Sequence, residues 1–331
     1  MGVDKLIDNS FRGCILISRE GKSIFEKAYG YADLPNEIPN QIDTKFATAS
    51  AGKVFVAVAI LQLVEKGMLH LADTIGNLLD VDLNQIDPAI TVEELLTHTS
   101  GIPDYFDESV MDEYEELWRD YPNYKIRSNK DLIPLFIDKP MMYPRGSKFQ
   151  YNNTGFVVLA LIIESVTGSA FDEYINEHIF KPCKMSGSGY YELDRLPAKC
   201  AVNYIYDEEH KNYRTNIFSV DAKGTGAGGA FITVKDIKSF WENLLSGKLL
   251  SNDMVSEMLS NHSNGAECYG YGIWLKKQGE VFTPYFQGSD PGVSFISSYN
   301  AKREQLLILV SNYGDNVWRL HKSINEYFEN E

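Results

Sequence analysis

Two long apolar stretches constrain the fold of this chain more than any other feature of its sequence. Residues 54–64 and 156–166 are apolar almost all the way around a helical projection, and a helix without a polar face is buried on every side. Both stretches are shorter than the roughly 20 residues that a membrane-spanning helix needs. The sequence therefore predicts two central helices enclosed by other elements, and it predicts no membrane span.

The composition is that of a folded and strongly acidic protein. The 331 residues suffice for a sizeable core, and 44% hydrophobic with 23% charged residues is typical of globular domains. The 31 Lys and Arg residues against 46 Asp and Glu residues give a net charge of −15. Nucleic acids and anionic membranes bind basic surfaces, so we expect neither as a partner.

Segments rich in β-formers lie at both ends of the chain. Residues 14–18 and 23–29 flank a polar turn that contains a glycine, which predicts a hairpin. Residues 292–299 and 305–312 form a second such pair, and a polar helix is expected from Asp315 onward. Strands at both ends with helices between them predict one antiparallel sheet built from the N- and C-terminal segments.

Several familiar signatures are missing. The four cysteines form no C-x-x-C pair, and the six histidines lack the spacing of metal ligands. Residues 224–229 match G-x-G-x-x-G but follow no hydrophobic strand, so we interpret them as flexible or tightly packed backbone near a cleft. We expect no metal and no cofactor. No signal peptide is visible, which predicts a cytoplasmic protein; an extracytoplasmic location stays open if an export signal has been removed.

Ser50 and Lys53 form an S-x-x-K motif that opens the first apolar helix. Residues three apart lie on one face of a helix, so the hydroxyl and the amine can touch. Burial lowers the pKa of a lysine, which lets the neutral amine accept a proton, and free N–H groups at a helix start favour negative charge. The motif predicts an activated serine. The alternative is a helix-capping serine followed by a lysine that reaches solvent.

Tyr151 and Asn153 form a Y-x-N motif directly before the second apolar helix. The same pattern occurs at residues 121–123, in a loop, and at residues 174–176, inside an amphipathic helix. Only the pair at 151 and 153 stands at the start of a buried helix. We expect its phenol to accept or return the proton of the serine, and its amide to hold Lys53 or a substrate carbonyl.

These motifs together resemble the serine β-lactamase and penicillin-binding protein superfamily, in the branch of class C β-lactamases, D,D-carboxypeptidases and esterases. The resemblance covers nearly the whole chain. Its further motifs follow in the same order: the LLTHTSGIPD stretch at residues 95–104, the glycine-rich segment at 228–233, and residues 269–272 and 290–292. Within the first of these stretches we expect His98 to have a structural hydrogen-bonding role.

The resemblance implies the fold. It is an α/β (α+β) fold of the β-lactamase/transpeptidase type, in which an antiparallel sheet is flanked by helices and a mostly helical lobe is inserted. We expect residues 1–331 to form a single catalytic unit, with residues 1–75 and 215–331 in the α/β lobe and residues 76–214 in the helical lobe.

The third motif of the family departs from its usual K-T-G or H-x-G, because the corresponding residues are Phe286, Gln287 and Gly288. The retained Gly288 allows a ligand to approach the backbone closely, and the N–H of Ser289 is expected to form an oxyanion hole with that of Ser50. We assign residues 286–289 to oxyanion and substrate binding. With Phe286 in place of a cation or imidazole, recognition of a substrate carboxylate should be weaker.

We therefore predict a serine hydrolase that forms an acyl-enzyme with an amide, β-lactam or ester, on a small-molecule or peptide substrate, in an undetermined oligomeric state. The alternative is a penicillin-recognising sensor or pseudoenzyme that binds a peptidoglycan-like or D-amino-acid ligand with little turnover. Phe286 favours this alternative, and the intact Ser50, Lys53 and Tyr151 oppose it. The acidic and aromatic residues 104–124 either rim the cleft or form a solvated face.

Overall fold

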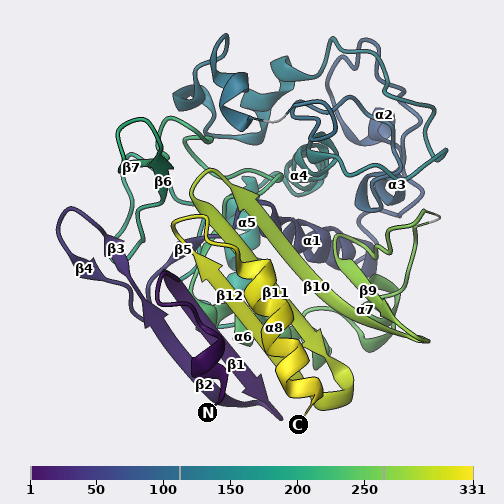
Figure 1. Cartoon of the computed structure of the whole chain (residues 1–331). Coiled ribbons are helices and arrows are strands. Elements are labelled where there is room, and N and C mark those ends of the chain that lie inside the picture. The colour runs from purple at the N-terminus through teal and green to yellow at the C-terminus, as the bar shows by residue number, and fades with distance from the viewer. Residues whose placement is uncertain (1, 112, 264, 331) are drawn as a thin grey trace.

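A six-stranded antiparallel sheet joins the two ends of the chain (Figure 1). The computed structural model describes residues 2–111, 113–263 and 265–330. The strand order is β2-β1-β12-β11-β10-β9, so the first strands of the chain lie beside the last. This confirms the predicted sheet of N- and C-terminal segments. The strands are β1 (Gly13–Arg19), β2 (Lys22–Tyr29), β9 (Trp274–Gln278), β10 (Val281–Asp290), β11 (Val293–Asn300) and β12 (Gln305–Ser311).

Helices cover both faces of this sheet. Successive side chains of a strand point to opposite faces, and in β1 Ile15 and Ile17 pack with α8 (Val317–Glu329). The alternate residues, Cys14 and Leu16, belong to the core that contains α6 (Val234–Leu245). Since both faces are buried, β1 is apolar along most of its length.

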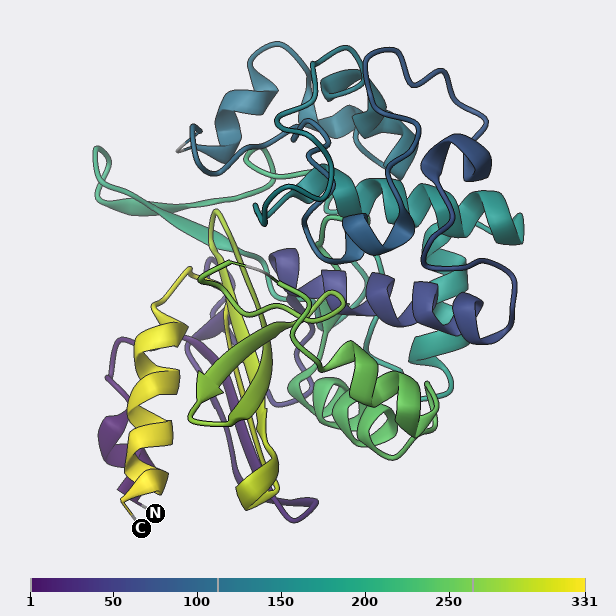
Figure 2. The same ribbon diagram turned by 90° about the vertical axis from the view of Figure 1, so that its right-hand side faces the viewer.

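The two apolar stretches form the central helices α1 (Lys53–Glu65) and α4 (Asn153–Thr167). The first eleven residues of each helix are buried, which confirms the prediction. Figure 2 shows α1 crossing the middle of the molecule with α4 beside it. Gly168 ends α4 in a left-handed conformation with φ 69°, a position that glycine takes without a steric penalty.

No single helix among the described residues is long and apolar enough to cross a membrane. Helix α4 and residues 171–180 together reach the length and apolar composition of a membrane span, but the chain bends by 82° between them. In the folded chain most of α4 lies inside the core.

The remaining elements are short. The helices are α2 (Ile75–Leu78), α3 (Val92–Leu96), α5 (Phe171–Ile175) and α7 (Asn252–Met258), with helical turns η1 (Gly2–Leu6), η2 (Ala49–Gly52), η3 (Tyr114–Trp118), η4 (Asn123–Lys125), η5 (Asn129–Leu135), η6 (Asn176–Phe180) and η7 (Ala301–Arg303). The strands are β3 (Tyr31–Asp33), β4 (Ile38–Pro39), β5 (Phe46–Ala47), β6 (Tyr204–Asp207), β7 (Asn212–Thr215) and β8 (Phe231–Ile232). The predicted lobe boundaries at residues 75 and 215 stay a prediction.

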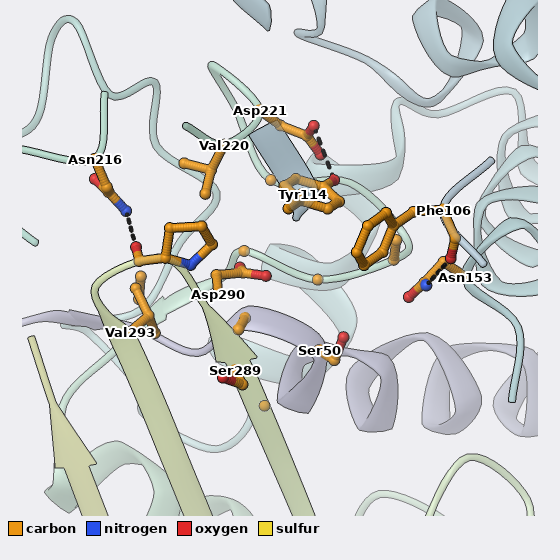
Figure 3. Close-up of a pocket in the computed structure, with 18 of the residues that line it drawn as sticks. Ser50, Phe106, Tyr114, Asn153, Asn216, Val220, Asp221, Ser289, Asp290 and Val293 are labelled. Carbon is orange, nitrogen blue, oxygen red and sulfur yellow. Dashed lines mark hydrogen bonds between the residues drawn. The ribbon is translucent and has the colours of Figure 1, made fainter. Parts of the chain in front are cut away.

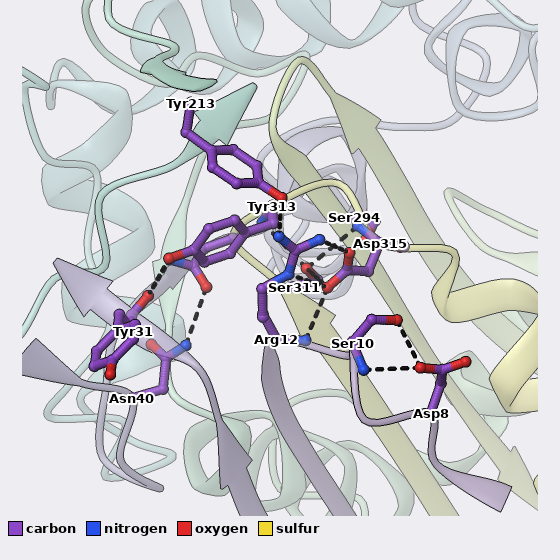
Figure 4. Close-up of polar contacts among 11 residues, drawn as sticks. Asp8, Ser10, Arg12, Tyr31, Asn40, Tyr213, Ser294, Ser311, Tyr313 and Asp315 are labelled. Atoms are coloured by element: carbon purple, nitrogen blue, oxygen red, sulfur yellow. Dashed lines mark hydrogen bonds and ion pairs between the residues drawn. The ribbon is translucent and has the colours of Figure 1, made fainter. Parts of the chain in front are cut away.

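A polar cluster fastens the β6–β7 hairpin to the sheet (Figure 4). The guanidinium of Arg12, just before β1, pairs with Asp315 at 2.6 Å between Nη2 and Oδ1 and donates a hydrogen bond to Tyr213 Oη on β7. Ser311 Oγ donates to the same carboxylate at 3.1 Å. Asn216, which follows β7, donates from Nδ2 to the carbonyl oxygen of Pro291 at 3.0 Å. The hairpin is thus held against the end of β10, where the main cavity opens.

Candidate active site

A cavity of about 660 Å³ lies where the S-x-x-K and Y-x-N motifs meet (Figure 3). Ser50 on η2 and Asn153 at the start of α4 are both in its wall, together with residues 287–290 at the end of β10. Residues in the ranges 105–111 and 113–114 supply a further part of the wall. Of the two interpretations of the acidic and aromatic segment, the structure supports the one in which it rims the cleft.

The turn that carries Ser50 is packed directly against β10. A Cβ atom on Gly288 would lie 2.7 Å from the backbone nitrogen of Ser50 and 2.3 Å from the carbonyl oxygen of Thr48, which is closer than real Cβ atoms come. The preceding residue, Ala49, is left-handed with φ 48°, a conformation that a non-glycine residue adopts only when its surroundings impose it. The backbone around Ser50 is therefore held in one shape by its neighbours.

Lys53 joins the two motifs. Its Nζ lies 3.0 Å from Ser50 Oγ and 2.9 Å from Asn153 Oδ1, and its third hydrogen bond goes to the carbonyl oxygen of Ala227. The side chain is 2% exposed. Burial lowers its pKa to about 8, against the opposing effects of nearby carboxylates. The alternative of a lysine that reaches solvent is therefore wrong.

Tyr151 stands above this lysine. Lys53 Nζ lies 5.0 Å from the centre of the phenol ring, and the ring stacks on Trp274 with centroids 5.8 Å apart. Burial raises the pKa of Tyr151 well above its usual value, while a hydrogen bond with Ser50 acts in the opposite direction. The phenol is therefore protonated near neutral pH and can donate a proton.

His98 and Asn152 position the Y-x-N motif. The backbone N–H of Asn152 donates to His98 Nδ1 at 3.1 Å, and His98 Nε2 lies 3.1 Å from Tyr269 Oη. Burial and the charge of Lys53 lower the pKa of this imidazole well below its usual value, so the ring is neutral. It packs against Tyr151 with centroids 4.6 Å apart. The predicted structural role of His98 is confirmed.

Asp104 fixes the start of α4. Its Oδ2 accepts a hydrogen bond from the N–H of Asn153 at 2.9 Å, and its Oδ1 accepts one from the N–H of Thr154 at 3.0 Å. Burial nevertheless raises the pKa of this carboxyl to about 6. Sequence reasoning placed Asp104 at the end of the stretch 95–104 but gave it no role, because its hydrogen-bond partners lie about fifty residues later in the chain.

The glycine-rich loop at residues 224–229 is packed backbone, as predicted. Gly229 N–H donates to the carbonyl oxygen of Ala49 at 3.0 Å, and a Cβ on Gly228 would lie 2.3 Å from that oxygen. The loop also presents the Ala227 carbonyl to Lys53. Its glycines therefore serve close contact with the turn that carries Ser50.

Comparison with known proteins agrees with this geometry. The β-lactamase family model matches residues 5–315. The chain belongs to the β-lactamase family. It is 30% identical over 307 residues to PbpX of Bacillus subtilis (strain 168), named as a candidate penicillin-binding protein, with 93% of this chain and 72% of PbpX covered.

Two further relatives extend the comparison. A teichoic acid D-alanine hydrolase of Staphylococcus aureus is 27% identical over 305 residues, covering 86% of this chain and 70% of the relative. The crystal structure of a penicillin-binding protein from Bacillus halodurans superposes with a TM-score of 0.94 at 36% identity, covering 98% of this chain and 99% of that one. The mixed fold with an antiparallel sheet is thus that of a family whose members include hydrolases.

The residues of the third motif lie partly in the cavity wall and partly in the core. Gln287, Gly288 and Ser289 line the cavity, and Gln287 Oε1 accepts a hydrogen bond from Trp318 Nε1 at 2.8 Å. Phe286 does not line it. This side chain is 2% exposed and stacks on Trp241 with centroids 5.3 Å apart. The assignment of Phe286 to substrate binding does not fit this placement, because the sheet alternation turns the ring toward α6.

The cavity wall is acidic. Glu108, Glu113, Asp221 and Asp290 line it, and no lysine or arginine is among the described residues that do so. No group of three or more His, Cys, Asp or Glu side chains suited to a metal ion occurs in residues 2–111, 113–263 and 265–330. Sequence reasoning offered the acids of the segment 104–124 as a possible rim of the cleft, but it missed Asp221 and Asp290, which lie far from that segment in the chain.

Proposed function

We propose that this protein is a serine hydrolase that cleaves an ester or amide through an acyl-enzyme on Ser50. The observation that carries the proposal is the 3.0 Å contact between Ser50 Oγ and the buried Lys53 Nζ. A buried amine with a lowered pKa spends a fraction of its time neutral near pH 7, and in that form it can accept the serine proton.

Acylation transfers the acyl group of the substrate to Ser50. Ser50 Oγ forms a bond to the substrate carbonyl carbon while its proton passes to Lys53 Nζ, and the carbonyl oxygen takes the negative charge. When this intermediate collapses, the leaving oxygen or nitrogen takes a proton from Tyr151 Oη, which recovers it from Lys53. Water then attacks the acyl-enzyme and releases the acid, with Ser50 regaining its proton.

The backbone N–H groups of Ser50 and Ser289 are the proposed donors to the oxyanion. Gly288 supports this role, because its lack of a side chain lets β10 lie against the turn of Ser50. One donor of an oxyanion hole contributes roughly 3–4 kcal/mol where it has been measured.

The charge of the cavity points to the class of substrate. β-Lactams and peptides ending in D-alanine carry a carboxylate, and no lysine or arginine among the described residues lines the cavity to pair with it. An ester or amide without that carboxylate fits better. The relative named as a teichoic acid D-alanine hydrolase supports an ester. A penicillin sensor, the second function considered, needs the same carboxylate to be bound and is disfavoured on the same ground.

The test compares the protein with a Ser50→Ala variant. Both are incubated with a fluorophosphonate and, separately, with a fluorescent penicillin, and intact masses are recorded alongside hydrolysis of a chromogenic ester. We expect a Ser50-dependent fluorophosphonate adduct and ester turnover, with weak penicillin labelling. A stable penicillin adduct without ester turnover would favour the sensor, and no Ser50-dependent adduct with either probe would refute catalysis.

A further inference from the structure

Two aspartates in the cavity lie close to the proposed reaction centre and form no ion pair with any described residue. Asp290 is the last residue of β10 and directly follows Ser289, and Asp221 lies across the cavity (Figure 3). Asp221 Oδ1 accepts a hydrogen bond from Tyr114 Oη at 3.2 Å. The carboxylate of Asp290 points into the cavity and has no hydrogen-bond or ion-pair partner among the described residues.

A partly buried carboxylate without an ion-pair partner is costly to keep ionised. Burial, together with the charge of Asp221, raises the pKa of Asp290 to about 8, and burial raises that of Asp221 to about 7. Lys53 acts against the shift of Asp290 but its three hydrogen bonds go elsewhere. A cation brought in by a ligand would stabilise both ionised carboxylates, because opposite charges attract strongly where water is excluded.

The position of Asp290 fits a cation on the acyl side of the scissile bond. Consecutive Cα atoms are 3.8 Å apart, so Asp290 lies one residue from the backbone N–H of Ser289, which is one of the two proposed donors to the oxyanion. In an aminoacyl group the amine nitrogen is bonded to the carbon next to the carbonyl. A carbonyl held by Ser289 therefore places this nitrogen within about one side-chain length of Asp290.

Aromatic rings complete the walls of this part of the cavity. Phe106 and Tyr114 meet edge to face with centroids 4.8 Å apart, and both line the cavity. The face of an aromatic ring attracts an ammonium group. The Tyr114 hydroxyl also orients the Asp221 carboxylate, so the ring and the acid form one wall.

We propose that the cavity selects esters or amides whose acyl group carries a free ammonium, with Asp290 as its main partner and Asp221 as the second carboxylate. The inference rests on the proposed function and names its substrate class. It assigns Asp290 and Asp221 to substrate binding, a role that neither the S-x-x-K nor the Y-x-N motif suggests.

The kinetic test uses a matched pair of substrates, alanine ethyl ester and N-acetylalanine ethyl ester, each as both enantiomers. Acetylation removes the positive charge and leaves the ester intact. We expect kcat/KM to be at least about tenfold higher for one enantiomer of the free amine, since hydrogen bonds to charged groups are among the strong ones. Asp290→Asn should reduce this ratio about tenfold, and Asp221→Asn should reduce it by a smaller factor.

Two controls test whether the preference for the free amine comes from the carboxylates of the cavity. Glu326→Gln removes an exposed carboxylate on α8 that pairs only with Lys322 in the described part of the chain, and it should leave both rates unchanged. Binding of the two esters to Ser50→Ala, measured by calorimetry, reports recognition without turnover. The free amine should bind more tightly, and the added substitution Asp290→Asn should abolish the difference.

The outcomes distinguish this inference from the proposed function. Ser50-dependent hydrolysis with equal or higher rates for the acetylated ester would overturn the ammonium site and leave the hydrolase intact. Absence of Ser50-dependent hydrolysis, with selective binding of the amine, would refute the proposed function and keep the ammonium site. Equal binding of both esters to Ser50→Ala would overturn the ammonium site whatever the turnover.

Discussion

At the scale of single residues, the environment of Lys53 decides whether Ser50 is a nucleophile. The amine is buried, touches the serine hydroxyl, and has its remaining hydrogen bonds to Asn153 and the Ala227 carbonyl. The fixed partners hold the amine in place, and burial supplies its lowered pKa. The same group could not act as a base if it were exposed, because an ordinary lysine is fully protonated near pH 7.

The pH dependence of acylation follows from this lysine. A base must be neutral to accept a proton, so the rate of Ser50 labelling by a fluorophosphonate should rise with pH and level off above about 8, the pKa of Lys53. Lys53→Met should lower the rate by about 10²- to 10⁴-fold and remove this rise. A rise that persists with the same midpoint in Lys53→Met would assign the titration to another group.

Phe286 belongs to the core, and its substitution tests that placement. Because the ring stacks on Trp241 and Phe295, Phe286→His buries a polar ring there and should cost about 2–4 kcal/mol in the free energy of unfolding. It should bring no gain on carboxylate-bearing substrates. Phe286→Leu is the matched control, which should cost less because it stays apolar. Urea unfolding measures the cost, and a gain in penicillin labelling would contradict the placement.

At the scale of elements, the site depends on contacts between segments that the sequence keeps far apart. The central helices and the terminal strands could be predicted from local sequence. A segment that is apolar around a whole helical turn indicates a buried helix, and a run of β-formers indicates a strand. The strand β9 could not, since Trp274–Gln278 has only two apolar residues, which are adjacent, followed by two lysines and a glutamine. The role of Asp104 was equally hidden, because its partners at the start of α4 lie about fifty residues away.

The contact between β10 and η2 can be broken by one methyl group. Gly288→Ala would place a Cβ 2.3 Å from the carbonyl oxygen of Thr48 and 2.7 Å from the nitrogen of Ser50. The two elements must then separate, which should reduce ester turnover by more than about tenfold, since loss of an oxyanion donor costs roughly 10²–10³. Gly279→Ala, where nothing lies within 4 Å and only the left-handed φ opposes a side chain, is the control. Equal turnover in Gly288→Ala and wild type would contradict the proposed oxyanion hole.

At the scale of the whole molecule, the net charge of −15 extends into the cavity. The sequence predicted the excess of acid but not its place, because Glu108, Asp221 and Asp290 are brought together only by folding. Binding sites often hold groups that reduce stability and gain from the ligand. The unpaired Asp290 is such a group, so the cavity should make the empty protein less stable at high pH.

The raised pKa of Asp290 makes the folded protein lose stability as the pH rises. An unfolded aspartate ionises near 3.8, whereas burial keeps Asp290 protonated in the folded protein up to about 8. Between these values the folded state binds the extra proton, so stability falls as pH rises from about 4 to about 8. Asp290→Asn cannot lose this proton. The Tm of Asp290→Asn minus the Tm of the wild type should therefore be about 2–4 °C larger at pH 9 than at pH 5. An unchanged Tm difference across this range, measured by calorimetry, would contradict the burial of an unpaired carboxyl.

The most direct test of the central claim is to trap the acyl group on Ser50. The protein is mixed with alanine ethyl ester, quenched in acid within milliseconds to seconds, and analysed by intact mass and peptide mapping, with Ser50→Ala as the control. We predict a mass increase of one alanyl group, located on the peptide that carries Ser50 and absent from the variant. Hydrolysis of the ester at the same rate in Ser50→Ala, with no adduct in either protein, would contradict the account.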